Sequence, residues 1–196
     1  MTFKERVHKE IIAGAAIYNK IFVDYEYLIH SKHFANKPYY IISADKDNYA
    51  HLTGVNSLVS AKDFFDTCLD GTIAESAFNF SSKRKSEKEV IGSVRRKIQM
   101  LPFLATIFQG QLYAEENFVK GKITCSLATA DNLLTIGFTE STILRPKTLL
   151  KNNELNHEKS VEVTLVLRRR RGTYTFDTVM QGDVDEFSVA FPNAMK

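Results

Sequence analysis

Apolar residues recur along the first 22 positions with the spacing of an α-helix. Val7, Ile11 and Ala15 lie on one face of that helix. Thr2 and Glu5 have the three-residue spacing of a capping box, in which each side chain satisfies a backbone N–H of the first turn. The pattern predicts a helix from about residue 3 to 22.

The next segments alternate between strand and helix signals. Two aromatic and β-branched runs at 25–31 and 37–45 flank a polar turn and predict a β-hairpin. A serine cap at Ser60 and a glycine at Gly71 bound a short amphipathic helix. From residue 81 a polar loop becomes a helix with an apolar stripe, which Pro102 kinks or ends.

The second half of the chain is mainly strand-like. Apolar runs separated by Gly, Asn and Asp occupy 111–121, 122–131, 133–142 and 160–180. In the last run Val161, Val163, Leu165 and Leu167 alternate with other residues, and a turn at Arg171 leads into a hairpin. The chain therefore predicts an α+β fold, with N-terminal helices packed on a mainly C-terminal antiparallel sheet.

One domain over 1–196 is expected, because 196 residues suffice for a single sizeable core. Within it, 1–80 is mixed helix and hairpin, 81–110 carries the basic helix, and 111–196 is mainly antiparallel strands.

Composition places this chain among cytoplasmic globular proteins. Hydrophobic residues make up 44% and charged residues 25%, which are ordinary values. No apolar run approaches the roughly 18 residues of a membrane span, and the charged N-terminus lacks the apolar centre of a signal peptide. Cys68 and Cys125 belong to no paired motif, which favours two reduced structural thiols.

The net charge of +3 is concentrated in two blocks. Residues 81–100 carry seven basic and two acidic side chains, and residues 143–171 carry eight and three, so each block has a net charge of +5. Two basic blocks in a nearly neutral chain indicate an anionic partner, of which nucleic acid is the commonest.

Motifs for several large enzyme classes are absent from the sequence. It contains no phosphate loop, dinucleotide fingerprint, HExxH or GxSxG. The acidic residues are scattered without a DxD or ExxH pair, so neither a metal site nor a cofactor is expected.

The remaining His, Thr, Ser, Lys and Arg side chains suit metal-independent cleavage of RNA. RNA supplies the nucleophile itself, because its 2′-hydroxyl attacks the adjacent phosphate. An enzyme then needs a base for the 2′-hydroxyl, an acid for the 5′-oxygen, and cations that stabilise the phosphorane. His51 in "HLTGV" is the best candidate histidine, although its ring can equally hold a turn together. Thr53 before Gly54 either caps that turn or bonds a phosphate oxygen.

Other candidates come from the two basic blocks. In the first block the cluster of Arg95, Arg96 and Lys97 is either a solvated helix face or part of the site. In the second, the hydroxyls of Thr139, Ser141 and Thr142 precede Arg145 and Lys147 and can supply phosphate contacts. The run at 168–171 ends a strand, so alternate arginines point to opposite sides and Arg168 and Arg170 can line one groove. Four consecutive arginines also resist edge pairing, which requires no ligand.

These segments together resemble a known family. The early helix, "HLTG" after an aromatic strand, the "DFF" helix, "RRKIQML" and "GFTESTILRPKTLLK" are similar to the PBECR group of phage-borne domains, named for Barnase, EndoU, colicin and RelE nucleases. The resemblance covers about residues 10–180. It implies helices on an antiparallel sheet and a metal-independent RNase activity, with His51 as the catalytic histidine and Thr53 as its neighbour. Arg95–Lys97 and the 139–142 hydroxyls would complete that site, and the general acid stays unassigned.

The leading hypothesis is therefore a cytoplasmic endoribonuclease-like protein of a phage or mobile element, which uses a histidine general base. The alternative is a non-catalytic phage protein that binds nucleic acid or inhibits a host protein through its basic surface. A third hypothesis is an interaction protein in which "HLTG" is only a turn. RNA is the expected partner, with a protein inhibitor or host target as a further one.

Overall fold

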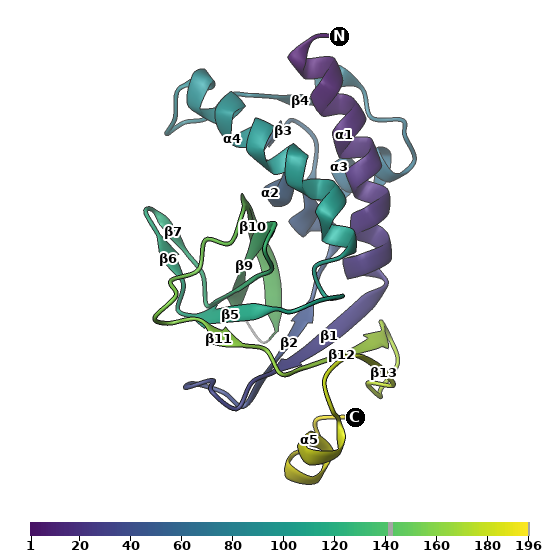
Figure 1. The fold of residues 1–196 in the computed structure, drawn as a ribbon. Helices are drawn as coiled ribbons and strands as arrows, with labels where there is room; N and C mark the ends of the chain where they lie inside the picture. Colours follow the sequence, from purple (N-terminus) through teal and green to yellow (C-terminus); the bar gives the residue numbers. More distant parts are fainter. Residues whose placement is uncertain (141–142, 196) are drawn as a thin grey trace.

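The computed structural model describes residues 1–140 and 143–195, and it confirms the predicted α+β class. Within those residues one large curled sheet holds nine strands, and helices α1 to α4 cover one of its faces (Figure 1). The short helix α5 (Asp185–Ala190) lies on the other face. The C-terminal helix was not predicted from the sequence.

The first helix begins and ends close to its predicted bounds. Helix α1 spans Phe3–Tyr18 and continues into a π-helical turn at Asn19–Val23. Its capping box is formed, because the Thr2 backbone N–H donates to Glu5 Oε2 at 2.8 Å and the Glu5 N–H donates to Thr2 Oγ1 at 3.2 Å. The apolar stripe through Val7, Ile11 and Ala15 is fully buried, mainly among the other helical segments.

The predicted hairpin forms the middle of the sheet. Strands β1 (Tyr25–His30) and β2 (Tyr39–Ser43) pair antiparallel. Strand β2 then meets β10 (Leu144–Lys151) in a parallel pair through Ile42 and Leu144. This contact joins the N-terminal hairpin to the strands of the second half, so the sheet is mixed and its centre comes from both halves of the chain.

The connections between strands carry the remaining helices. A short 3-10 turn at Lys46–Asn48 leads into α2 (Tyr49–Thr53), which α3 (Ala61–Leu69) and α4 (Glu87–Met100) follow. A small separate sheet pairs β3 (Asn56–Ser57) with β4 (Phe78–Asn79), after a 3-10 turn at Glu75–Ala77. Helix α4 gives way to a 3-10 segment at Leu101–Ala105, so Pro102 does end the α-helix.

The second half adds seven strands to the large sheet and one small hairpin. These are β5 (Tyr113–Glu116), β6 (Val119–Lys120), β7 (Ile123–Thr124), β8 (Leu127–Ala130), β9 (Leu134–Glu140), β10, β11 (Val161–Glu162), β12 (Leu165–Arg170) and β13 (Thr178–Gln181). In the large sheet the order is β11-β5-β8-β9-β10-β2-β1-β12-β13, while β6 and β7 pair separately.

The expectation of one continuous strand through 160–167 was wrong. Residues Val161–Glu162 pair with β5 at one edge of the sheet, whereas Leu165–Arg170 pairs with β1 near the other edge. Only two residues separate these strands, so the sheet must curl until its two edges lie close together. The Val163 N–H donates to Leu112 O and the Thr164 N–H donates to His30 O, both at 2.9 Å, which holds the crossing chain in place.

The sheet buries apolar side chains on both faces. The main core lies between the sheet and helices α1 to α4. On the outer face, a second cluster under α5 includes Leu28, Leu165, Leu167, Phe176 and Phe187. Cys68 and Cys125 are both buried and free. No helix in the described part of the chain is long and apolar enough to cross a membrane.

Candidate functional site

The "HLTG" segment is the C-terminal end of helix α2 rather than an open turn. Gly54 has a left-handed backbone with φ of 77°, and its N–H donates to Ala50 O at 3.2 Å. Thr53 is fully buried, and its hydroxyl donates to the same carbonyl oxygen at 2.8 Å. Because the Thr53 hydroxyl is engaged with the backbone and shielded from solvent, its placement argues against direct contact with a substrate.

Lys97 on α4 packs against the C-terminal end of helix α2. Its Nζ donates to the His51 carbonyl oxygen at 2.5 Å, and its stem lies over Gly54, where an added Cβ would sit 2.8 Å from Lys97 Cδ. Burial of the amine, with a smaller contribution from the nearby charge of Lys85, lowers the pKa of Lys97 to about 8. The structure therefore brings Lys97 to the backbone of His51, while the imidazole of His51 is exposed to solvent.

The other two basic residues of this cluster face solvent. Arg95 and Arg96 are exposed on α4, and the Arg95 guanidinium lies 5.4 Å from the centroid of the Phe3 ring. Both are thus available to a partner on the helix side of the protein.

The hydroxyl and basic residues of the β9–β10 hairpin lie on the outer face of the sheet. Phe138 packs into the core beneath the helices, so the next residue of the strand, Thr139, points the opposite way. Arg145 pairs with Thr139 across the hairpin, and Lys147 Nζ donates to Thr124 O at 2.5 Å. Ser141 and Thr142 lie outside the described residues. The sheet therefore separates Thr139 and Lys147 from His51, and these predicted site residues do not converge.

The arginines of β12 alternate between the two faces, as predicted. Arg168 lies over the Tyr25 ring at 4.3 Å, on the face that β12 shares with Val166 and the helix-side core, and Arg170 is exposed next along that face. Arg169 points to the outer face, where its guanidinium lies 4.4 Å from the centroid of the Phe176 ring. The arginines chosen from the sequence, Arg168 and Arg170, are thus those on the helix side.

Arg169 forms a largely buried ion pair with a carboxylate of the neighbouring strand. Glu26 on β1 is its register partner, and Arg169 Nε donates to Glu26 Oε2 at 2.7 Å. The two side chains are only 16% and 11% exposed. Little solvent separates the two charges, so their mutual attraction is only weakly screened.

A second carboxylate at the same end of the sheet holds two more arginines. Asp45, just after β2, forms ion pairs with Arg145 of β10 and with Arg171 after β12. Arg171 Nη1 also donates to Ala44 O at 2.8 Å. We refer to Glu26, Asp45, Arg145, Arg169 and Arg171 as the carboxylate–arginine cluster. Four strands contribute or precede its members, so its geometry is fixed by the sheet.

This cluster combines two acid–base groups with three fixed cations. Guanidinium groups bind phosphate oxygens through paired N–H donors, and a carboxylate can accept a proton from a hydroxyl. Beside it, Tyr174 is 85% exposed, and its carbonyl oxygen accepts a hydrogen bond from Arg169 Nη1 at 3.0 Å.

Sequence reasoning found only Arg145 of this cluster. The Arg169–Glu26 hydrogen bond spans 143 residues of chain and the Arg145–Asp45 bond spans 100, so no local motif links their members. The sequence signal that points to Arg169 and Arg171 is the alternation within 168–171, which places them on the face opposite to Arg168 and Arg170. No group of three His, Cys, Asp or Glu side chains suited to a metal ion is found among residues 1–140 and 143–195.

Helices on one face of a curled mixed sheet define an α+β protein. The chain matches the family model PBECR4, described as phage-Barnase-EndoU-ColicinE5/D-RelE like nuclease4, over residues 10–184. It therefore belongs to this nuclease family, which implies a nucleic-acid substrate. Neither the curated proteins nor the solved structures include a match to it.

Proposed function

We propose that the protein is a metal-independent endoribonuclease and that the carboxylate–arginine cluster is its phosphodiester site. The observation that carries the proposal is the meeting of Glu26 and Asp45 with three arginines at one end of the sheet. Membership of the nuclease family supports a nucleic-acid substrate. RNA is proposed because these residues supply what 2′-hydroxyl attack needs.

In this mechanism the RNA supplies its own nucleophile. The phosphate of the substrate competes with the carboxylates for the guanidinium groups of Arg145 and Arg171, which bond its non-bridging oxygens. Glu26 then takes the proton of the 2′-hydroxyl as that oxygen attacks phosphorus. The three arginines stabilise the charge of the phosphorane. The 5′-oxygen takes a proton from a solvent water as it leaves, and Glu26 then returns its own proton to the solvent. The products are a 2′,3′-cyclic phosphate and a 5′-hydroxyl.

His51 is the second candidate for the general base. It follows Asp45 by six residues along a continuous 3-10 and α-helical segment, which places the two backbones about 10 Å apart at 1.5–2.0 Å per residue. Its exposed ring is free of hydrogen bonds to the described residues. A histidine at this distance is close enough to meet a neighbouring part of the same RNA strand.

A non-catalytic role is the alternative function, and the helix-side basic residues favour it. Arg95, Arg96 and Arg170 are exposed, and Lys83 to Lys85 lie in the loop before α4. Such a surface binds nucleic acid through phosphates, or an acidic host protein, without turnover. It predicts salt-sensitive RNA binding by a protein that cleaves nothing.

The test measures cleavage of a labelled single-stranded RNA in EDTA. We expect 2′,3′-cyclic phosphate ends and a loss of roughly 10²- to 10⁴-fold in rate for Glu26→Gln, the range of general acid–base catalysis. Glutamine is chosen because it keeps a hydrogen-bond acceptor for Arg169, whereas deleting a partner of a buried pair costs about 3–5 kcal/mol. Glu158→Gln, an exposed glutamate outside the cluster, is the matched control.

The outcomes separate the candidates. Loss of cleavage in His51→Ala with full activity in Glu26→Gln moves the base to His51. Cleavage that requires an added metal ion contradicts the metal-independent mechanism. Binding without cleavage, under all conditions, supports the non-catalytic alternative.

A further inference from the structure

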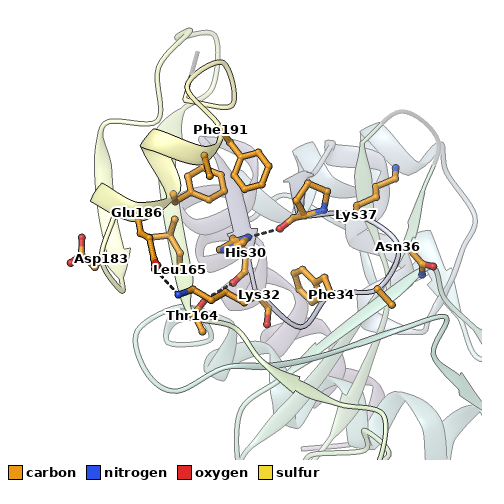
Figure 2. A pocket seen from close by; sticks show the side chains of 15 residues that line it. His30, Lys32, Phe34, Asn36, Lys37, Thr164, Leu165, Asp183, Glu186 and Phe191 are labelled. Atoms are coloured by element: carbon orange, nitrogen blue, oxygen red, sulfur yellow. Dashed lines mark hydrogen bonds and ion pairs between the residues drawn. The ribbon is translucent and has the colours of Figure 1, made fainter.

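A large cavity on the outer face of the sheet lies apart from the carboxylate–arginine cluster. It has a volume of about 770 Å³ and opens between helix α5 and the loop 31–38 that joins β1 to β2. Figure 2 shows His30 near its centre, with Phe34 of the loop and Phe191 after α5 on either side. This volume falls within the roughly 300–1,000 Å³ typical of ligand sites.

The walls of the cavity are aromatic. Phe187 and Phe191 lie 5.1 Å apart between ring centroids, and Phe187 lies 5.0 Å from the His30 ring. On the loop side, Phe34 packs edge-on against Tyr40 at 5.2 Å. Rings held by such neighbours offer flat surfaces for a flat ligand at little cost in side-chain freedom.

The loop that forms one wall is held in place by the sheet. The Glu116 carboxylate on β5 accepts hydrogen bonds from the backbone N–H groups of Ala35 at 2.6 Å and of Asn36 at 3.0 Å. It also accepts a hydrogen bond from the hydroxyl of Tyr40. Two of these hydrogen bonds hold the loop and the third ties the same carboxylate to β2, so this wall of the cavity exists before a ligand binds.

His30 provides a directional polar group inside the aromatic walls. Its Nδ1 lies 2.5 Å from the carbonyl oxygen of Pro38. A carbonyl oxygen can only accept, so Nδ1 carries the proton, and in the neutral ring Nε2 is left as an acceptor. A ligand with an N–H or N–H₂ group in its plane can satisfy this acceptor.

The charges at the rim favour a neutral group inside and an anionic group at one side. Lys32 forms an ion pair with Glu186 at 2.6 Å, and Lys37 forms one with Glu140, so the cavity itself has no unpaired cation among these residues. Lys32 and Lys37 both lie on the loop, whereas Asp183 and Glu186 lie on the α5 side. A phosphate attached to the ligand would therefore lie along the loop.

We propose that this cavity binds one unpaired nucleobase of the nucleic-acid substrate. A base is flat, aromatic and neutral, it carries in-plane N–H groups, and it is attached to a phosphate chain. Glu26 and His30 both point to the outer face of β1, four residues apart, or about 13 Å at ~3.3 Å per residue. The inference rests on the proposed function, because it makes the cavity a subsite for the same strand.

The probe is a short single-stranded oligonucleotide that cannot be cleaved. Every sugar carries a 2′-O-methyl group, and one base is 2-aminopurine, whose fluorescence falls when it stacks on an aromatic ring. The protein contains no tryptophan, which keeps the background low. Saturable quenching is expected with the unmodified full chain.

The variants test whether the quenching arises in this cavity. Phe34→Leu and Phe191→Leu keep an apolar side chain but remove a ring, and each should weaken binding roughly tenfold and reduce quenching, the order expected for one lost stacking contact. Phe103→Leu, a partly exposed phenylalanine outside the cavity, should leave both unchanged. Ala190→Leu narrows the cavity without removing any contact, so it gives the same answer if a phenylalanine variant fails to fold.

Two results would overturn the proposal: binding of the oligonucleotide without quenching, or quenching that persists in Phe34→Leu, Phe191→Leu and Ala190→Leu. Binding without quenching is the result expected if the cavity holds a protein side chain instead of a base. Cleavage of unmodified RNA by the same preparation is scored separately. Cleavage without quenching overturns the base pocket alone, and quenching without cleavage overturns the nuclease proposal alone.

Discussion

The stability of this protein should depend on pH through the amine of Lys97. The single substitution Lys97→Met should remove this dependence. The amine is half-buried beside the end of helix α2, and burial lowers its pKa from 10.5 to about 8. Between pH 8 and 10.5 the unfolded chain therefore binds a proton at this residue that the folded chain does not. Stability contributed by Lys97 is complete above pH 10.5 and is lost as pH falls through 8.

The size of the effect follows from the same values. Each pH unit of difference corresponds to about 1.36 kcal/mol, so a fall from 10.5 to about 8 corresponds to about 3 kcal/mol. Partial exposure of the side chain reduces this to about 1–3 kcal/mol. Lys97→Met keeps the stem that lies over Gly54 and removes the titration.

The assay is denaturant unfolding of both proteins from pH 7.5 to 10.5 in the presence of a reductant. The quantity of interest is the difference in free energy of unfolding, wild type minus Lys97→Met, which should rise by about 1–3 kcal/mol across this range. A difference is needed because burial raises the pKa of Cys68 to about 12, which lowers the stability of both proteins above pH 9. Lys88→Met, an exposed lysine of the same helix, should give a flat difference. A flat difference for Lys97→Met as well would refute the reasoning.

Three further outcomes are expected. Gly54→Ala should lower the free energy of unfolding more than Gly121→Ala does. Both variants place alanine in a left-handed conformation, which costs about 1–2 kcal/mol, but only at residue 54 does the added Cβ meet Lys97, at 2.8 Å. Equal losses in free energy would contradict the close approach. Burial raises the pKa of the Cys68 thiol to about 12, so this thiol should react with a disulfide reagent at pH 8 only as fast as the protein unfolds. The Cys68→Ser protein keeps Cys125 alone, so a fast reaction that this control also shows is assigned to Cys125. Tyr174→Ala should weaken RNA binding by about 1–3 kcal/mol in anisotropy titrations without changing the melting temperature, because Tyr174 is 85% exposed, its backbone contacts Arg169, and an exposed aromatic ring can stack on a base. Unchanged affinity would show that Tyr174 does not contact the substrate.

Local chemistry explains which elements were predictable. The capping box of Thr2 and Glu5, the stop at Pro102 and the helical stripe through Val90, Val94 and Ile98 depend on residues within a few positions of each other, and all are present. The strand through 160–167 failed because alternation does not report the pairing partner. Its two halves pair with β5 and β1, which lie near opposite edges of the sheet.

The site divides in the same way. The sequence indicated a nuclease-like chain with basic blocks, and it identified His51 and Lys97, which meet through a backbone carbonyl. Whether His51 is the catalytic base is a prediction that the cleavage assay decides. The hydroxyl of Thr53 holds the end of a helix, and Thr139 lies across the sheet from His51, since adjacent strand residues face opposite ways.

The sequence by itself determined the α+β class, the capped N-terminal helix, the central hairpin and the alternation of the four arginines, because each follows from backbone geometry over a short stretch. Only the tertiary structure decided which arginines meet carboxylates. Glu26 reaches Arg169, and Asp45 reaches Arg145 and Arg171, because the curled sheet aligns strands that are far apart in the chain. The cavity beside His30 likewise exists only because α5, at the C-terminal end, packs beside the loop that follows β1.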